Sequence, residues 1–139
     1  MEVRLGALPG TYEDGTKISD VLEWNHYGTP TISPRPVLRE AAEKLVSTKE
    51  MKEHLKSYFK NMVEYSKRGR LNDMKEAEKK MLTALGQQAV AEAKRLIESR
   101  TIIPRNADST IARKPKIGNK PLYETGKLEK HLSYEIAED

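Results

Sequence analysis

A helical pattern of apolar residues occupies nearly the whole stretch from Val37 to Arg100, and it constrains the fold more than any other feature of the chain. It has three parts, over residues 37–46, 51–63 and 74–97, each with apolar side chains three or four positions apart. This spacing predicts amphipathic helices that bury one side against a shared core.

The boundaries of these helices also have sequence signals. Ser47 with Glu50, and Asp73 with Glu76, have the spacing of capping boxes, which predicts that helices start at both points. Between them, a basic pair followed by Gly69 is typical of a helix end. We therefore expect one helix to end near Gly69 and the longest helix to run on to Arg100.

Two further features bear on packing. The middle helix carries apolar residues at helical spacing, namely Met51, Leu55, Tyr58, Phe59, Met62 and Val63. In the longest helix, Gly86 lies mid-helix, where it costs up to ~1 kcal/mol relative to Ala. We therefore expect another element to pack closely on the helix at Gly86.

The two ends of the chain predict strands. Residues 1–8 alternate between apolar and polar, and so do residues 132–136. Between them, a short helix over Ile18–Tyr27 should point Ile18, Val21 and Leu22 inward, with Trp24 a further candidate, and Gly28 suits its end. The expected fold is α+β, in which a small antiparallel sheet that includes the terminal strands packs against long helices. Because two strands alone are marginal, a third should form within 28–36 or 101–124, or neighbouring subunits should extend the sheet.

Composition indicates a single domain over residues 1–139. Hydrophobic residues make up 37% of the chain, aromatic residues only 6%, and charged residues 33%, with a net charge of +4. With so few aromatic residues the hydrophobic core should be small, so we expect contacts between subunits to contribute to stability. The chain has no Cys, so disulfides and thiolate metal sites are excluded. Its apolar runs are too short to cross a membrane, and we expect no signal peptide.

The segment from Thr101 to Gly126 has no sustained apolar period and forms a long basic loop, here called the arm. Loops of this length inside a compact domain are usually functional or disordered. Its cationic side chains include Arg113, Lys114, Lys116 and Lys120. They fit either a solvated loop or contact with a polyanion such as DNA. We expect the arm to order on contact with a neighbouring subunit, with Ile111 and Leu122 as apolar anchors.

A second candidate interface precedes the first long helix. Arg35 and Arg39 flank the rigid residue Pro36, so they could hold a partner's carboxylates or a phosphate. Alternatively, Pro36 merely starts the helix while both arginines are solvated.

Residues that could carry catalysis or hold a metal are scattered. His26, His54 and His131 lie far apart and none has a metal-ligand spacing. Gly126-Lys127 resembles the end of a phosphate loop, but the flanking residues do not fit that motif. Ser109 and Thr110 have no identifiable base. We therefore expect no enzymatic activity, no cofactor and no metal.

Three segments, in chain order, resemble the tail-completion or neck proteins of tailed bacteriophages, also called virion morphogenesis proteins. The first is VLEWNHYGTPTISPRPVLREA, although Val37 stands where that family has Phe. The second is the long helix with Leu85-Gly86. The third is PRNADSTIARK followed by KPLYETGKLEKHLSYEI.

This resemblance implies an α+β structural subunit of the virion without enzymatic activity, assembled in the host cytoplasm. Such subunits form rings, often hexamers, at the head–tail junction or tail end, and contact tail tube, neck or connector proteins. The matching positions include Arg35, Pro36 and Arg39. A ring encloses a lumen, where the basic residues of the arm could face double-stranded DNA as it passes, without sequence readout. The alternative from another class is a stand-alone protein that binds nucleic acid through residues 101–120. A hydrolase is a distant third.

Overall fold

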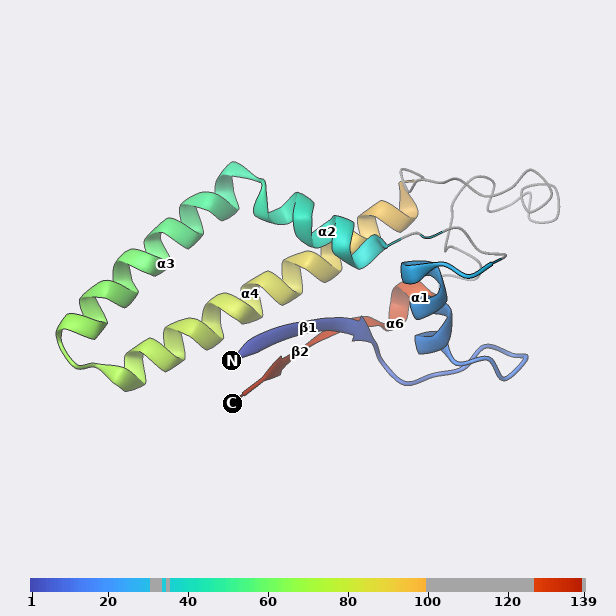
Figure 1. The fold of residues 1–139 in the computed structure, drawn as a ribbon, viewed down its shortest axis with the longest axis horizontal. Coiled ribbons are helices and arrows are strands. Elements are labelled where there is room, and N and C mark those ends of the chain that lie inside the picture. The colour runs from blue at the N-terminus through green and yellow to red at the C-terminus, as the bar shows by residue number, and fades with distance from the viewer. Residues whose placement is uncertain (31–33, 35, 100–126, 139) are drawn as a thin grey trace.

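The computed structural model of this chain describes residues 1–30, 34, 36–99 and 127–138. It confirms an α+β fold built from long helices and a small sheet (Figure 1). In chain order the elements are β1 (Glu2–Ala7), α1 (Ile18–Tyr27), α2 (Val37–Val46), α3 (Lys49–Lys67), α4 (Leu71–Glu98), α6 (Lys127–His131) and β2 (Leu132–Ala137). None of the described helices has the length and apolar content needed to cross a bilayer.

The two terminal strands pair with each other, as the alternating patterns predict. β1 and β2 are antiparallel, with Val3 opposite Ile136 and Leu5 opposite Tyr134. In the described part of the chain the sheet has only these strands. A third strand is absent from residues 28–30, 34 and 36, while the rest of 28–36 and all of 101–124 lie outside the described residues. The sheet runs along α4, so one of its faces is covered (Figure 1).

Close packing at Gly86 is confirmed. A Cβ atom at this position would lie 2.6 Å from two atoms of the Tyr134 ring and 3.0 Å from Cγ2 of Val3. The separation from Tyr134 is shorter than real Cβ contacts, and the one from Val3 is tighter than most, so glycine lets α4 approach both strands this closely. Gly86 therefore fixes the distance between α4 and the sheet.

The main core lies where α2, the second half of α4 and β2 meet. Its buried members are Val37, Leu38, Ala41, Val90, Ala93, Leu96, Ile97 and Leu132. In the first half of α4, Met74, Ala77, Met81 and Leu85 are only partly buried. The apolar side of α4 was thus predicted in the right place, but only its second half is enclosed.

Several helix boundaries differ from the sequence signals. α3 is capped by the hydroxyl of Thr48, which accepts from the Met51 amide at 3.3 Å, rather than by Ser47. α4 starts at Leu71, before the expected start at Asp73, which instead forms an ion pair with Arg70. The observed N-caps, Thr48 and Arg70, thus lie one residue after and three residues before the predicted ones.

A short helix just before β2 was not expected. α6 carries Leu128, which is 2% exposed, and leads into Leu132, which is 3% exposed. Leu128 in the helix and Leu132 at the start of the strand therefore both point into the protein interior. These buried leucines pack α6 and the start of β2 against the rest of the protein.

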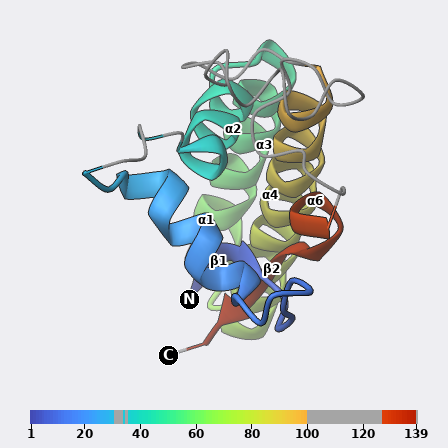
Figure 2. The ribbon, with the colours of Figure 1, turned by 90° about the vertical axis from the view of Figure 1, so that its right-hand side faces the viewer.

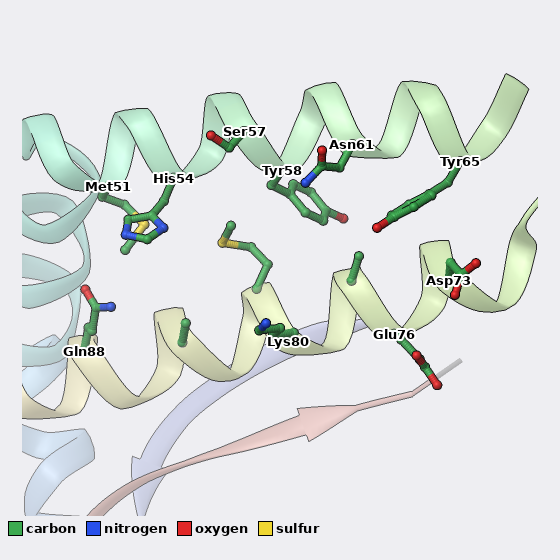
Figure 3. Close-up of a pocket in the computed structure, with 13 residues that line it drawn as sticks. Met51, His54, Ser57, Tyr58, Asn61, Tyr65, Asp73, Glu76, Lys80 and Gln88 are labelled. Atoms are coloured by element: carbon green, nitrogen blue, oxygen red, sulfur yellow. The ribbon is translucent and has the colours of Figure 1, made fainter.

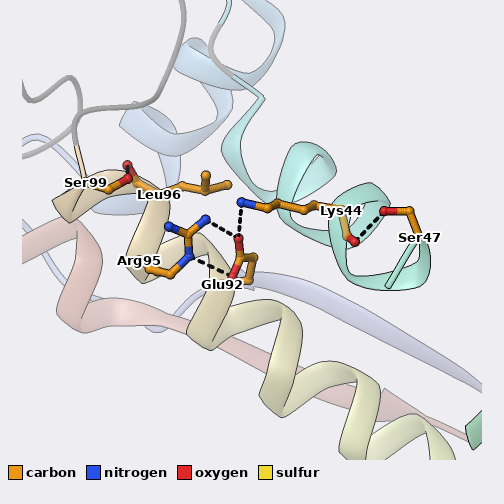
Figure 4. A network of polar contacts seen from close by, with 6 residues as sticks. All are labelled: Lys44, Ser47, Glu92, Arg95, Leu96 and Ser99. Atoms are coloured by element: carbon orange, nitrogen blue, oxygen red, sulfur yellow. Dashed lines mark hydrogen bonds and ion pairs between the residues drawn. The ribbon is translucent and has the colours of Figure 1, made fainter. Parts of the chain in front are cut away.

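An ionic contact links α2 to α4 (Figure 4). Glu92 of α4 accepts from Arg95 at 2.6 and 3.0 Å and lies 3.2 Å from Nζ of Lys44 on α2. The hydrogen bond from Arg95 is the main cause, and Lys44 a further one, of a Glu92 pKa lowered to about 2. The carboxylate is therefore charged at neutral pH and joins the two helices at the edge of the core.

Candidate functional site

Four regions of the described chain could contact other molecules: the groove between α3 and α4, the contact between α1 and α2, the outer face of α3, and the exposed side of α1. α3 and the first half of α4 form a helical hairpin whose turn lies at the end of the molecule opposite α1 (Figure 1).

The groove between α3 and α4 has a volume of about 470 Å³. Tyr58 and Tyr65 extend into it from α3, and Met81 and Ala77 line it from α4 (Figure 3). Among the residues that line it, only Met51, near the start of α3 and opposite the turn of the hairpin, is fully buried. Partial burial raises the pKa of the Tyr58 hydroxyl, and the charge of Glu78 raises it further, so this phenol stays neutral at physiological pH.

The polar side chains of this groove do not form a catalytic arrangement. His54 lies toward one end and Asp73 toward the other (Figure 3). No hydrogen bond joins His54 to Ser57 or Asp73 in the part of the chain that the structure describes. A base must lie within hydrogen-bond reach of the group it activates, so this set does not provide a nucleophile. Among the described residues, no three His, Asp or Glu side chains gather closely enough to hold a metal ion.

The contact between α1 and α2 involves one of the predicted interface residues. Nη2 of Arg39, in the first turn of α2, lies 3.2 Å from Nε2 of His26 near the end of α1. Burial lowers the His26 pKa, and the positive charge of Arg39 lowers it further. Because a guanidinium can only donate, Nε2 must be the acceptor and the ring proton must sit on Nδ1.

This contact links two helices of the same chain, but it leaves much of Arg39 exposed. Pro36 occupies the N-cap position of α2 with φ −78°, directly before the buried Val37 and Leu38. Pro36 thus starts the helix, as one of the two interpretations of this turn supposed. The remaining predicted site residues lie outside the described chain: Arg35, Ile111, Leu122, Arg113, Lys114, Lys116 and Lys120.

The outer face of α3 was missed by sequence reasoning, which identified the apolar positions of the helix but not which of them are covered. Phe59 is 61% exposed and Val63 is 53% exposed. They lie on the side of α3 turned away from α4, because the side toward α4 is already taken by Met51, Tyr58 and Met62. The sequence did contain a signal of this. Apolar residues occur in adjacent pairs at 58–59 and 62–63, so they cover too wide a part of the helix surface for one neighbouring helix to bury.

α1 carries a second exposed apolar group. Trp24 is 42% exposed and Tyr27 is 72% exposed, so the assignment of Trp24 to the core was wrong. The inner side of α1 is filled by Ile18 and by Asn25, whose side-chain amide donates to the Val21 carbonyl at 2.8 Å. Trp24 and Tyr27 lie on the opposite side of the helix.

Comparison of the chain with protein-family models, curated proteins and solved structures finds no match.

Proposed function

We propose that this chain is a non-enzymatic structural subunit of a tailed-bacteriophage virion. In this proposal it forms a ring at the head–tail junction or tail end, completes or connects the tail, and lets DNA pass through the lumen. It needs no metal or cofactor. The order of the three sequence motifs, from residue 21 to residue 136, is the observation that carries the proposal.

Features of the described structure support an assembly role. The core is small, and several large apolar side chains remain on the surface of α1 and α3, among them Trp24, Tyr27 and Phe59. Exposed aromatic residues of this kind are enriched where proteins bind other proteins. The two-stranded sheet also leaves strand edges that a neighbouring subunit could extend.

Mass measurement of the purified protein tests the proposal directly. Native mass spectrometry or light scattering should find a closed oligomer, either alone or after addition of tail tube, neck or portal components. A protein that stays monomeric with every one of these components would overturn the assembly role.

A stand-alone nucleic-acid-binding protein is the second candidate. The observation in its favour is the row of lysines on α3, at positions 49, 52, 56, 60 and 67. For that function, the monomer should bind duplex DNA with an affinity that falls steeply as salt rises. Weak DNA binding by a protein that forms oligomers would favour the structural role instead.

A further inference from the structure

The exposed face of α3 is basic as well as apolar. Besides Phe59 and Val63, it presents Lys52, Lys56 and Lys60, all exposed and spaced four residues apart on one side of the helix. None of these lysines forms an ion pair in the described chain. We call this set of five residues the α3 outer face.

The exposed face of α1 has the opposite charge. Asp20 and Glu23 share one side of the helix with Trp24 and Tyr27, because positions 23, 24 and 27 follow Asp20 by three, four and seven residues. Neither carboxylate forms an ion pair among the described residues. We call these four residues the α1 outer face, which is acidic and aromatic.

The two faces cannot meet within one chain. α1 lies beside the sheet at one end of the elongated molecule, and α3 projects at the other end (Figures 1 and 2). α4 alone, with 28 residues, rises about 42 Å along the molecule. Two complementary faces at opposite ends of the same chain are suited to contact between copies.

We propose that the α3 outer face of one copy binds the α1 outer face of the next copy, head to tail. This inference rests on the proposed assembly role and names the surfaces that carry it. Trp24, Tyr27 and Phe59 supply the apolar anchors, and the lysines of α3 face the carboxylates of α1. Aromatic anchors dominate interface energetics, while complementary charge sets register and excludes wrong pairings.

A head-to-tail contact also determines the kind of assembly. Each copy uses a different face toward each of its two neighbours, so the contact repeats until the ring closes. A symmetric dimer, in contrast, would need each face to bind itself. The α3 outer face cannot do so without bringing its lysines against like charges, which costs affinity.

Charge reversal tests the proposal. The α3 variant carries Lys56→Glu and Lys60→Glu, and the α1 variant carries Asp20→Lys and Glu23→Lys. Each variant alone should raise the dissociation constant for self-assembly roughly tenfold or more, as measured by analytical ultracentrifugation. An equimolar mixture should assemble again, because each reversed face then meets an opposite charge on the other variant. A chain with all four substitutions should also assemble by itself.

The matched control carries Lys75→Glu on α4 and Lys130→Glu on α6, two exposed lysines outside both faces and outside the α3–α4 groove. These changes alter the net charge by the same amount and should leave assembly intact. Circular dichroism establishes that each variant is folded. If a reversed α1 helix is destabilised, the neutral pair Asp20→Asn and Glu23→Gln, with a smaller loss of affinity expected, takes its place in the comparison.

The outcomes separate this inference from the proposed function. If the wild type assembles and the reversed variants assemble equally well, this interface is wrong while the assembly role stands. If both variants are monomeric and their mixture stays monomeric, the two faces do not bind each other, and the inference is again wrong. A wild type that never assembles overturns both. Loss of DNA binding in the α3 variant, with assembly unchanged, would assign the lysines to a polyanion.

Discussion

At the scale of single residues, Gly86 determines how closely α4 and the sheet approach. We expect Gly86→Ala to lower the free energy of unfolding by about 1 kcal/mol, measured by urea denaturation. Alanine gains up to ~1 kcal/mol in helix propensity, but its Cβ would stand 2.6 Å from the Tyr134 ring, and overpacking typically costs ~1–3 kcal/mol. Gly6→Ala is the control, because its Cβ would meet no atom within 4 Å. A more stable Gly86→Ala protein would contradict the close packing described here.

Glu92 gives a prediction about pH. Its folded pKa of about 2 lies below its ordinary value of 4.5, mainly because Arg95 donates to the carboxylate. A lowered pKa stabilises the fold above pH 4.5, and this contribution is lost as pH falls toward 2. Since the contact is partly solvated, we expect Glu92→Gln to cost about 1 kcal/mol at pH 7.

The difference between wild type and Glu92→Gln should shrink toward zero between pH 4.5 and pH 2, as followed by urea denaturation. Glu98→Gln is the control, because Glu98 is exposed and forms no ion pair in the described chain. A difference that does not change with pH would show that Glu92 acts through packing rather than charge.

At the scale of elements, the existence of most helices and both strands was predictable from periodicity alone. α1 was predicted at its observed bounds because Gly28, with φ 81°, supplies a clear stop. α6 was not predicted, since five residues hold too little of a helical period to be recognised in the sequence. The capping residues of α3 and α4 also differed, because more than one nearby side chain offers the same capping chemistry.

What covers each helix could not be predicted, because periodicity identifies an apolar side but not its partner. On α3, for example, two large apolar side chains lie in opposite environments: Met51 is 2% exposed, whereas Phe59 is 61% exposed. We expect Met51→Ala to lower the free energy of unfolding by about 2 kcal/mol or more. Phe59→Ala should change it by about 0.5 kcal/mol or less.

The same pair of variants separates folding from assembly. If the α3 outer face binds a neighbour, Phe59→Ala should weaken self-association while its thermal melting curve stays near that of the wild type. A strongly destabilised Phe59→Ala monomer would mean that the side chain packs within its own subunit, contrary to its exposure in the structure.

At the scale of the whole molecule, the chain is elongated, with different chemistry at its two ends (Figure 1). The basic and apolar end on α3 and the acidic and aromatic end on α1 come from segments far apart in sequence. Sequence reasoning located two candidates that the structure describes, Pro36 and Arg39, but it could not find these faces. Their significance depends on which side of each helix the core leaves uncovered, and that is a property of the assembled fold.

Arg39 gives the last prediction, which concerns folding and assembly together. Its side chain is exposed and its contact with His26 is one hydrogen bond at 3.2 Å, so Arg39→Ala should cost about 0.5–1.5 kcal/mol of stability at most. The same substitution should prevent ring formation, measured by native mass spectrometry, if Arg39 also holds a neighbouring subunit. His26→Ala is the matched control, because it removes the same hydrogen bond but keeps the guanidinium. A ring lost in Arg39→Ala and kept in His26→Ala assigns Arg39 to the interface, whereas equal loss in both variants shows that the contact between α1 and α2 is what assembly requires.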